Sequence, residues 1–340
     1  MKKLTATMPR SKKVFEVQRL VRGPWRRFID ELAEYRPGLH AYCRHLTGDV
    51  WDGEDLVQDT LLRVFSQLGR TDTRIENPKA YLIRTATNLW IDRVRRTVRE
   101  QAALTIQQSE ESQRLPDPAD GMLAANALFK MLHPQERAAV VMKDVFDFSL
   151  EETASLLDTT AGAVKSALSR ARGRLEGRRP RAGFEAPPRE LVERFMRVLA
   201  TRDIETMRTL CAENLSVELV GGVKMDSFER AKTIFQHAHM VMPKVGFGEN
   251  PRWECVEYEG EPMVAGFRTL DGVEGLNEVH RFEVSDDRIV AVRTYCFTPE
   301  TLAVLAEALG CKSLPRPYRS PSVMDFCKAM LGLKPRWRRR

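Results

Sequence analysis

The chain lacks the features that define secreted, membrane and metal-binding proteins. Its six cysteines lie far apart, with no Cys-x-x-Cys pair and no His-x-x-x-His spacing, which argues against a zinc site or a disulfide framework. No run approaches the ~18 apolar residues that a membrane span needs. The basic N-terminus has no apolar core after it, so it is not a signal peptide. These absences predict a cytoplasmic protein with reduced thiols, no metal, no cofactor and no membrane contact.

Positive charge is unevenly distributed over the 340 residues, whose net charge is +7. Residues 1–182 hold 31 Lys and Arg against 24 Asp and Glu, whereas residues 183–340 hold 23 of each. The excess therefore lies wholly in the first half of the chain. An excess of this kind predicts that the first half, and not the second, binds nucleic acid.

Residues 149–175 have the pattern of two short helices joined by a tight turn. Ser149 and Glu152 form a capping-box pattern at the first helix start, and Thr160 is a plausible N-cap for the second. The second helix has an apolar stripe made of Val164, Leu168, Ala171 and Leu175. A helix that is basic on one side only suits the DNA major groove. An ordinary helical hairpin with a solvated basic face has the same local pattern.

An acidic amphipathic helix is predicted upstream, over residues 51–68. Residues 49–62 contain no basic residue but five acids, which are Asp49, Asp52, Glu54, Asp55 and Asp59. Acids in a first turn favour the helix dipole, which accounts for Asp52 but not for a continuous acidic face. Asn77-Pro78 then predicts the start of another helix, which runs to about Arg99.

The pattern changes in the second half of the chain. Residues 189–213 and 226–240 are predicted to be helical, with a strand at 215–220 between them. Four strand-like runs follow, near 252–258, 263–269, 276–284 and 288–297. Their turns are Glu259-Gly260, Asp271-Gly272 and Asp286-Asp287. Helices packed on a curved antiparallel sheet are the natural interpretation.

Two groups of motifs, in this order, resemble a known family. Glu54-Asp55-Leu56-Val57-Gln58-Asp59-Thr60, Leu62-Arg63-Val64, Pro78-Lys79-Ala80-Tyr81-Leu82 and Asn88-Leu89-Trp90-Ile91-Asp92-Arg93 resemble sigma region 2. Ala163-Val164-Lys165-Ser166 and Ser169-Arg170-Ala171-Arg172 resemble sigma region 4. Over roughly 25–178 the chain is similar to an extracytoplasmic-function (ECF, sigma-70 family group 4) RNA polymerase sigma factor. Residues 189–297 resemble the SnoaL-like branch of the NTF2 fold. Thr298-Pro299-Glu300-Thr301-Leu302 then stands where relatives of this class have an Asn-Pro-Asp-Lys-Leu-like motif.

The resemblance implies a multidomain chain. We expect two all-α sigma domains, a region 2 helical bundle and a region 4 helix-turn-helix, followed by an α+β NTF2/SnoaL-like domain with a curved sheet. The expected division is a basic arm at 1–24, region 2 at 25–100, a linker at 101–120, region 4 at 121–178, a linker at 179–188, the SnoaL-like domain at 189–297, and a C-terminal helical extension with a basic tail at 298–340.

The resemblance also implies the partners, core RNA polymerase and promoter DNA. The acidic helix would dock on the clamp helices of the β′ subunit through Asp52, Glu54, Asp55, Gln58 and Asp59, while region 4 would contact the β flap. The −10 strand would contact Arg84, Asn88, Arg93, Arg95 and Arg96, beside the loop 69–77. Asp92 matches the family too, although a structural ion pair with an arginine explains it equally. The −35 element would contact Lys165, Ser166, Ser169, Arg170, Arg172 and Arg174, and Ala167 replaces a larger or basic family residue, which predicts fewer contacts there.

Three functions remain open from the sequence. The leading hypothesis is a dissociable polymerase subunit whose SnoaL-like domain regulates it in cis, without enzymatic activity, and with room for a small ligand. The alternative is a ligand-sensing helix-turn-helix regulator that does not bind polymerase. The third is a catalytic SnoaL-like domain, for which the chain offers acids and a histidine at no selective spacing. These are Asp226, Glu254, Glu257 and His280, while Trp253, Phe267, Phe282 and Tyr295 are expected to be core or pocket lining.

Overall fold

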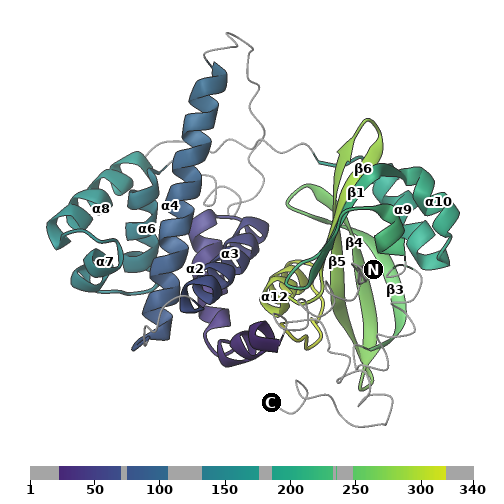
Figure 1. Cartoon of the computed structure of the whole chain (residues 1–340), viewed down its shortest axis with the longest axis horizontal. Coiled ribbons are helices and arrows are strands. Elements are labelled where there is room, and N and C mark those ends of the chain that lie inside the picture. The colour runs from purple at the N-terminus through teal and green to yellow at the C-terminus, as the bar shows by residue number, and fades with distance from the viewer. Residues whose placement is uncertain are drawn as a thin grey trace, which may run out of the picture.

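The computed structural model describes residues 23–69, 75–105, 132–175, 186–232, 235 and 248–318. A helical half and a sheet half lie side by side, with helix α12 between them (Figure 1). Residues 1–22 of the expected arm at 1–24, most of the 101–120 linker and residues 319–340 of the expected C-terminal extension lie outside the described residues. Within the described ranges, no helix combines the length and the apolar character needed to cross a bilayer.

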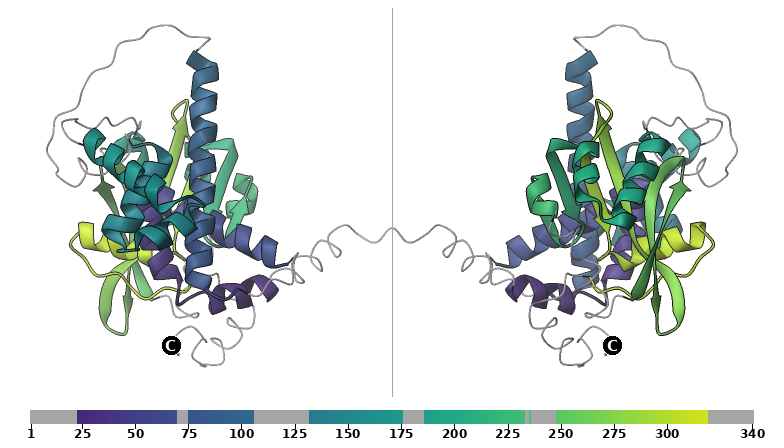
Figure 2. Two further views of the ribbon diagram at one scale, coloured as in Figure 1. Left: turned by 90° about the vertical axis from the view of Figure 1, so that its left-hand side faces the viewer. Right: turned by 90° about the vertical axis from the view of Figure 1, so that its right-hand side faces the viewer.

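The first helical domain contains a helix at 23–31, α2 (Arg36–Thr47), α3 (Val50–Leu68) and α4 (Pro78–Thr105). Asp49 caps α3 by accepting the backbone N–H groups of Trp51 and Asp52. Asn77 accepts the Ala80 N–H at the start of α4, as its position before proline predicts. α4 continues six residues past the expected Arg99, into the expected linker, and projects beyond the rest of the helical half (Figure 2).

The second helical domain contains α6 (Pro134–Val140), a π-helical turn η1 (Val141–Val145), α7 (Leu150–Leu156) and α8 (Ala161–Leu175). Both predicted caps are present, because Ser149 and Glu152 form the capping box and Thr160 accepts the Ala163 N–H. Asp158 has a φ of 53° in the turn, a left-handed conformation that glycine would adopt without strain.

Ala167 corrects one expectation about α8. Its side chain is only 7% exposed and packs in the apolar cluster with Ala154, Val164 and Leu168. The position therefore faces the core of the helix-turn-helix and is not a weakened DNA contact. Its small size fits the close approach of the helices.

The C-terminal domain begins with α9 (Arg189–Thr201) and α10 (Ile204–Leu210). Its six strands are β1 (Cys211–Leu219), β2 (Val223–Met225), β3 (Glu249–Tyr258), β4 (Glu261–Leu270), β5 (Val273–Ser285) and β6 (Arg288–Tyr295), followed by α12 (Pro299–Ala308). The order in the sheet is β2-β1-β6-β5-β4-β3, antiparallel throughout except for the parallel β1/β6 pair.

Three details of this domain differ from the expectation, and the first is the parallel β1/β6 pair in a sheet expected to be antiparallel. Residues 211–213 begin β1 rather than ending a helix, and β2 was not anticipated. The three predicted turns are confirmed, since both residues of each have positive φ, as tight β-hairpins require.

The sheet has two different faces. One packs under α9 and α10 in a cluster that includes Phe195, Phe282 and Val292. The other packs against α12 and the start of α3, in a cluster that includes Trp51, Met263 and Tyr295. The mixed, open sheet with helices on one face is the architecture of an NTF2-like domain, and its second face joins it to the sigma-like half.

Candidate functional site

Glu54 on α3 lies at the junction of the two halves and is fully buried. Its Oε1 accepts from Arg36 Nη2 at 2.5 Å and from Gln58 Nε2 at 2.6 Å. Its Oε2 accepts from the Thr301 hydroxyl, on α12, at 3.1 Å. Burial raises the pKa of the Glu54 carboxyl, and the Arg36 guanidinium opposes that shift. Glu54 is therefore a structural link between α2, α3 and α12 in this conformation.

Asp55, the next residue on α3, is held by the sheet domain. Arg293 on β6 donates from Nη1 to Asp55 Oδ2 at 2.9 Å and from Nη2 to Asp55 Oδ1. Arg293 Nε also donates to Glu218 Oε2 at 3.2 Å. Burial alone would lower the pKa of Arg293, but the hydrogen bonds to Asp55 and the nearby negative charges raise it. A bidentate pair of this geometry fixes orientation as well as contributing energy.

Trp51, at the start of α3, is the apolar anchor of the contact and is 4% exposed. Its ring lies 4.7 Å from that of Tyr295 and 6.1 Å from that of Tyr258. The Arg281 guanidinium lies 4.4 Å from the centroid of the same ring. A buried tryptophan surrounded by aromatic and arginine side chains is typical of a specific interface rather than a loose contact.

The segment Thr298–Leu302 forms the start of α12 and contacts α2. His40 Nε2 lies 3.1 Å from Thr301 Oγ1, and Arg36 Nε lies 3.7 Å from Glu300 Oε2. Tyr318 donates to Glu300 Oε1 at 2.7 Å, and Arg36 lies 4.9 Å from the centroid of the Tyr318 ring. Burial, together with the charges of Arg36 and Arg44, lowers the pKa of His40 to about 3.

The other residues predicted to bind polymerase are placed differently. Asp52 and Asp59 are exposed, and Asp59 accepts from Arg93 at 2.6 Å. Gln58 is half-buried, and its Nε2 lies near Gly221 of the loop between β1 and β2. The sheet domain thus covers Glu54 and Asp55, beside Gln58, while the two outer acids face solvent.

The residues predicted for the −10 strand lie along α4. Arg84 donates to the Ser155 carbonyl of α7, which joins the two helical domains, and Arg93 is half-buried in its pair with Asp59. Asn88, Arg95 and Arg96 have exposed side chains. Asp92 is also exposed, and residues 70–74 of the loop lie outside the described residues.

The residues predicted for the −35 element lie on the outer side of α8. Lys165, Ser166, Ser169 and Arg170 are exposed. Arg170 Nε donates to Glu136 Oε1 at 3.0 Å, and Ser166 donates back to the Gly162 carbonyl at 3.0 Å. The side chains of Arg172 and Arg174 lie outside the described residues. The four described side chains share the face opposite the buried stripe of α8.

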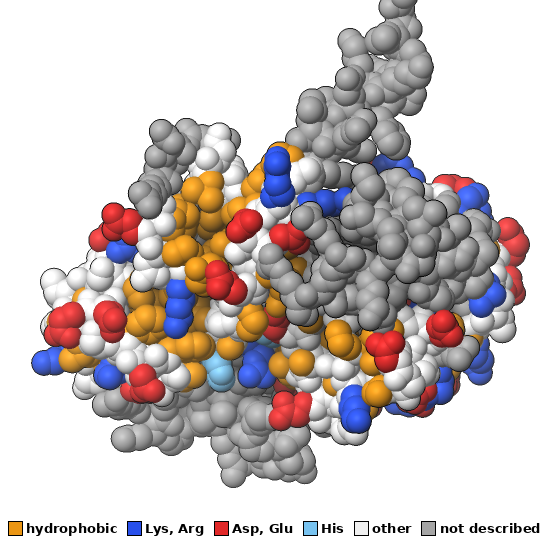
Figure 3. Space-filling view, turned by 90° about the horizontal axis from the view of Figure 1, so that it is seen from below, with side chains coloured by type: hydrophobic (Ala, Val, Ile, Leu, Met, Phe, Trp, Pro, Cys, Tyr) orange, Lys and Arg blue, Asp and Glu red, His pale blue; other side chains and the backbone are white. Residues whose placement is uncertain are grey.

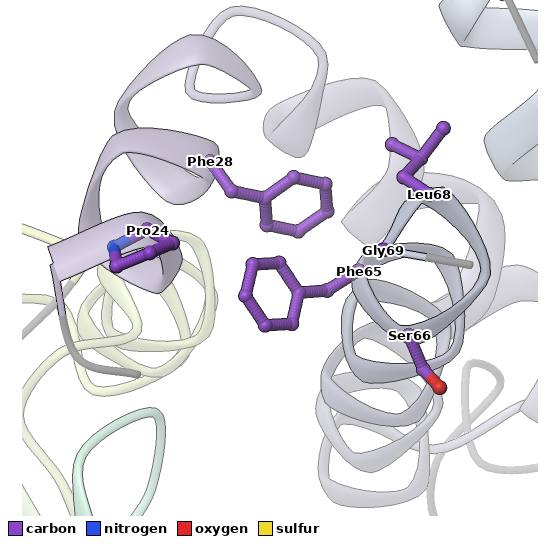
Figure 4. A pocket seen from close by; sticks show the side chains of 6 residues that line it. All are labelled: Pro24, Phe28, Phe65, Ser66, Leu68 and Gly69. Carbon is purple, nitrogen blue, oxygen red and sulfur yellow. The ribbon is translucent and has the colours of Figure 1, made fainter. Parts of the chain in front are cut away.

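An open apolar pocket of about 520 Å³ lies at the end of α3, beside the loop predicted to hold the −10 strand. Its walls are Pro24, Phe28, Phe65, Ser66, Leu68 and Gly69 (Figure 4). The rings of Phe28 and Phe65 lie 5.3 Å apart. Seen from below, apolar side chains gather over the helical half, among single charges of both signs (Figure 3). The described charges on that face are of both signs, unlike the one-sign surface that suits DNA.

The sequence interpretation missed the partners that cover α3. Arg293 and Tyr295 alternate on β6, a spacing that places both on one face of a strand. That spacing does not say which face meets another domain. The sequence did contain one indication of a buried contact at the start of α3. Val50 and Trp51 are large apolar residues next to each other at the start of an acidic helix.

Comparison with known proteins agrees with this architecture. Residues 32–100 match Sigma-70 region 2, and residues 123–175 match Sigma-70, region 4. The RNA polymerase sigma-E factor of Streptomyces coelicolor is 36% identical over 140 residues, covering 39% of this chain and 75% of the relative. The chain belongs to the sigma-70 family of RNA polymerase sigma factors, in its ECF group, and carries a C-terminal α+β domain with an open, mixed sheet.

Two mycobacterial proteins are similar over most of the chain. The ECF RNA polymerase sigma factor SigG of Mycobacterium tuberculosis is 26% identical over 302 residues, covering 78% of this chain and 80% of the relative. The crystal structure of the ECF sigma factor SigJ of the same organism is 20% identical, with a TM-score of 0.30, covering 80% of this chain and 97% of that one. Similarity to SigG therefore extends beyond the two sigma regions into the C-terminal domain.

Proposed function

We propose that this ECF sigma factor is kept in a closed state by its own C-terminal domain, and that core RNA polymerase binds only after α3 is uncovered. The observation that supports this is the Asp55–Arg293 pair. Both carboxylate oxygens of Asp55 accept from Arg293, so this carboxylate is already paired and is not available to a cationic group of a partner protein. Binding of the β′ clamp helices through Asp52, Glu54, Asp55, Gln58 and Asp59 would require this pair to break.

The packing of region 4 on region 2 supports the same proposal. Met142, Phe146 and Leu156 contribute to the apolar core that is built around Tyr42 and Leu56 of region 2. The −35 and −10 elements lie about 25 base pairs apart, or ~85 Å at 3.4 Å per base pair. Two domains that share a core cannot reach both elements at once, so promoter binding requires them to separate.

In the open state, the two sigma domains would divide the recognition of the promoter. Arg84, Asn88, Arg93, Arg95 and Arg96 would hold the −10 strand, with the arginines on phosphates. The outer face of α8 would contact the −35 element, with base edges read by Ser166, Ser169 and Arg170, and phosphates held by Lys165, Arg172 and Arg174. Opening releases Arg84 from Ser155, which makes that guanidinium available to DNA.

The C-terminal domain would then serve regulation rather than catalysis. Glu254 and Glu257 are exposed on β3, and Asp226 is exposed in a pair with Arg230. These acids are dispersed and do not form the pair of carboxylates in an apolar site that general acid–base chemistry favours. We expect the protein to act in the cytoplasm, where it would meet the polymerase, the β flap and the promoter.

The test is to open the closed state with one substitution. Arg293→Ala removes the partner of Asp55 without changing α3, so affinity for core polymerase should rise about tenfold, and run-off transcription should rise with it. Arg288→Ala is the matched control, because Arg288 is an exposed arginine at the other end of β6. The proposal would be contradicted if the Arg293→Ala chain bound core polymerase no more tightly than the Arg288→Ala chain.

A further inference from the structure

Charged side chains lie inside the C-terminal domain, on the sheet face that does not meet α3. Arg268 on β4 is 2% exposed, and His280 on β5 is 4% exposed. Arg316, from the segment after α12, is 6% exposed, and the Glu278 side chain on β5 is 12% exposed. Charged residues are rarely buried to this degree unless each is paired, so the pairing within this cluster is informative.

Two arginines of the cluster act on the same carboxylate. Arg268 Nη2 donates to Glu278 Oε1 at 3.2 Å, and Arg316 also acts electrostatically on Glu278. Burial opposes ionisation of Glu278, yet the charge of Arg268 and its neighbours holds the pKa of that carboxyl below its ordinary value. Burial lowers the pKa of His280, which keeps the imidazole neutral. Among the described residues, two guanidinium groups thus act on the Glu278 carboxylate.

Hydrogen-bond donors of the cluster are also left over. Arg268 Nε and Nη1 are buried without a hydrogen-bond partner. His280 Nε2 also has no hydrogen-bond partner, and it lies 3.9 Å from Glu278 Oε2. The other ring nitrogen, His280 Nδ1, lies 2.9 Å from Thr294 Oγ1, and Arg316 Nε donates to the Cys296 carbonyl at 2.8 Å. A buried polar group without a partner is costly, and native proteins satisfy nearly all of them. Unused donors on the buried, positively charged guanidinium of Arg268 call for an anionic acceptor.

The surroundings of the cluster are apolar. The Trp253 ring lies 5.5 Å from the His280 ring, and Phe282 and Val292 belong to the apolar cluster on the same face. Gly266 lies directly under Trp253 and Glu278, where a Cβ would come within 2.6 Å of the indole ring. A ligand here would meet charge at one end and aromatic or aliphatic side chains around it.

We propose that Arg268, His280 and Arg316 form a buried binding site for a small organic carboxylate, whose oxygens accept from Arg268 and whose apolar part packs beside Trp253. This site goes beyond the proposed function and does not depend on it. Strand β6 links the proposed ligand site to the contact with α3. Thr294 and Cys296 face the ligand site, whereas Arg293 and Tyr295 face α3. These four residues are consecutive in the chain and alternate between the two faces of the sheet.

The test measures binding of benzoate, acetate and inorganic phosphate to the full chain by calorimetry and by the unfolding temperature. Benzoate should bind and raise the unfolding temperature, acetate should bind more weakly, and phosphate should bind at least tenfold more weakly than benzoate. Arg268→Met should lower benzoate affinity at least tenfold. Arg252→Met is the matched control, because Arg252 is an exposed arginine of the same sheet, and its affinity for benzoate should be that of the parent chain.

A second readout separates a ligand site from a structural ion pair. Because Arg268→Met leaves Glu278 with Arg316, the ligand-free variant should unfold at the same temperature as the parent chain or a higher one. If that variant does not fold, His280→Phe should still lower benzoate affinity at least threefold. No benzoate binding at 10 mM, unchanged binding in both variants, or phosphate binding as tight as benzoate would each overturn the assignment.

Discussion

The acidic face of α3 and the basic face of α8 are both predicted contact surfaces, but the C-terminal domain covers part of the first and leaves the second exposed. Glu54 and Asp55 on α3 are held by Thr301 and Arg293 of the C-terminal domain. The described outer side chains of α8 are exposed, and the pair that Arg170 makes is within its own domain. Under the proposed function, the C-terminal domain would therefore control polymerase binding more directly than −35 recognition.

The largest effect is expected from reversing the charge of α3. The double substitution Asp55→Lys and Asp59→Lys should lower core affinity more than 100-fold, because two attractive charges become repulsive at the proposed interface. Co-purification with core polymerase measures this, and Glu205→Lys on the exposed side of α10 is the control. Normal co-purification of the double variant would remove α3 as the docking surface.

A smaller effect is expected from weakening the cover over α3. Thr301→Val deletes the hydroxyl that donates to Glu54 and lies beside His40, which costs the closed state about 1–3 kcal/mol because a buried carboxylate oxygen loses its donor. Core affinity should rise about tenfold, while −35 DNA affinity of the chain should change much less. Thr209→Val, at an exposed threonine of α10, should leave both affinities unchanged. Equal changes in the two affinities would argue against separate control of the two faces.

A change on α8 should have the reverse selectivity. Lys165→Ala removes one proposed phosphate contact, so −35 DNA affinity should fall about fivefold and the salt dependence of binding should lose about one unit of slope. Core affinity should stay the same. Fluorescence anisotropy with labelled promoter DNA at several salt concentrations measures both quantities, with Lys224→Ala on β2 as the control. A loss of core affinity instead would show that the two faces are not independent.

The smallest effect is a pH dependence that originates at His40. The pKa of His40 is about 3 when it is buried against Thr301 and near 6.5 when it is exposed, so protonation favours the unfolded chain. Its contribution to stability is complete above pH 6.5 and is lost as the pH falls toward 3. Between pH 8 and pH 6 the free energy of unfolding should fall by about 0.8 kcal/mol from this group. Urea unfolding should show that difference in the parent chain but not in His40→Gln.

Much of the fold could be predicted because it depends on local signals. Ser149 with Glu152, Thr160, and Asn77 before Pro78 cap helices through their nearest neighbours in the chain, and the three hairpin turns need residues that tolerate positive φ. β2 was missed because three residues are too few to show a period. The end of α4 was placed too early, because residues 100–104 are good helix formers without a breaker, so the helix continues to Thr105.

The contact surfaces could be predicted only in part. The exposed side of α8 follows from helical periodicity, since its apolar stripe leaves one outer face. Ala167 lies at the edge of that stripe, and tertiary packing against α6 and α7 decided that it is buried. For α3, the sequence identified an acidic face but not its partners, because Arg293 and Thr301 are more than 230 positions away in the chain.

The sequence by itself determined the helices, the hairpins and the two sigma motifs, since each depends on residues within a few positions of one another. It also determined the uneven charge, which is a sum over each half of the chain. Tertiary structure alone decided that Glu54 and Asp55 are covered, that region 4 shares the core of region 2, and that Arg268 and Arg316 share one carboxylate. These features arise when distant segments exclude water together, so the energy of each charge depends on partners that local sequence does not specify.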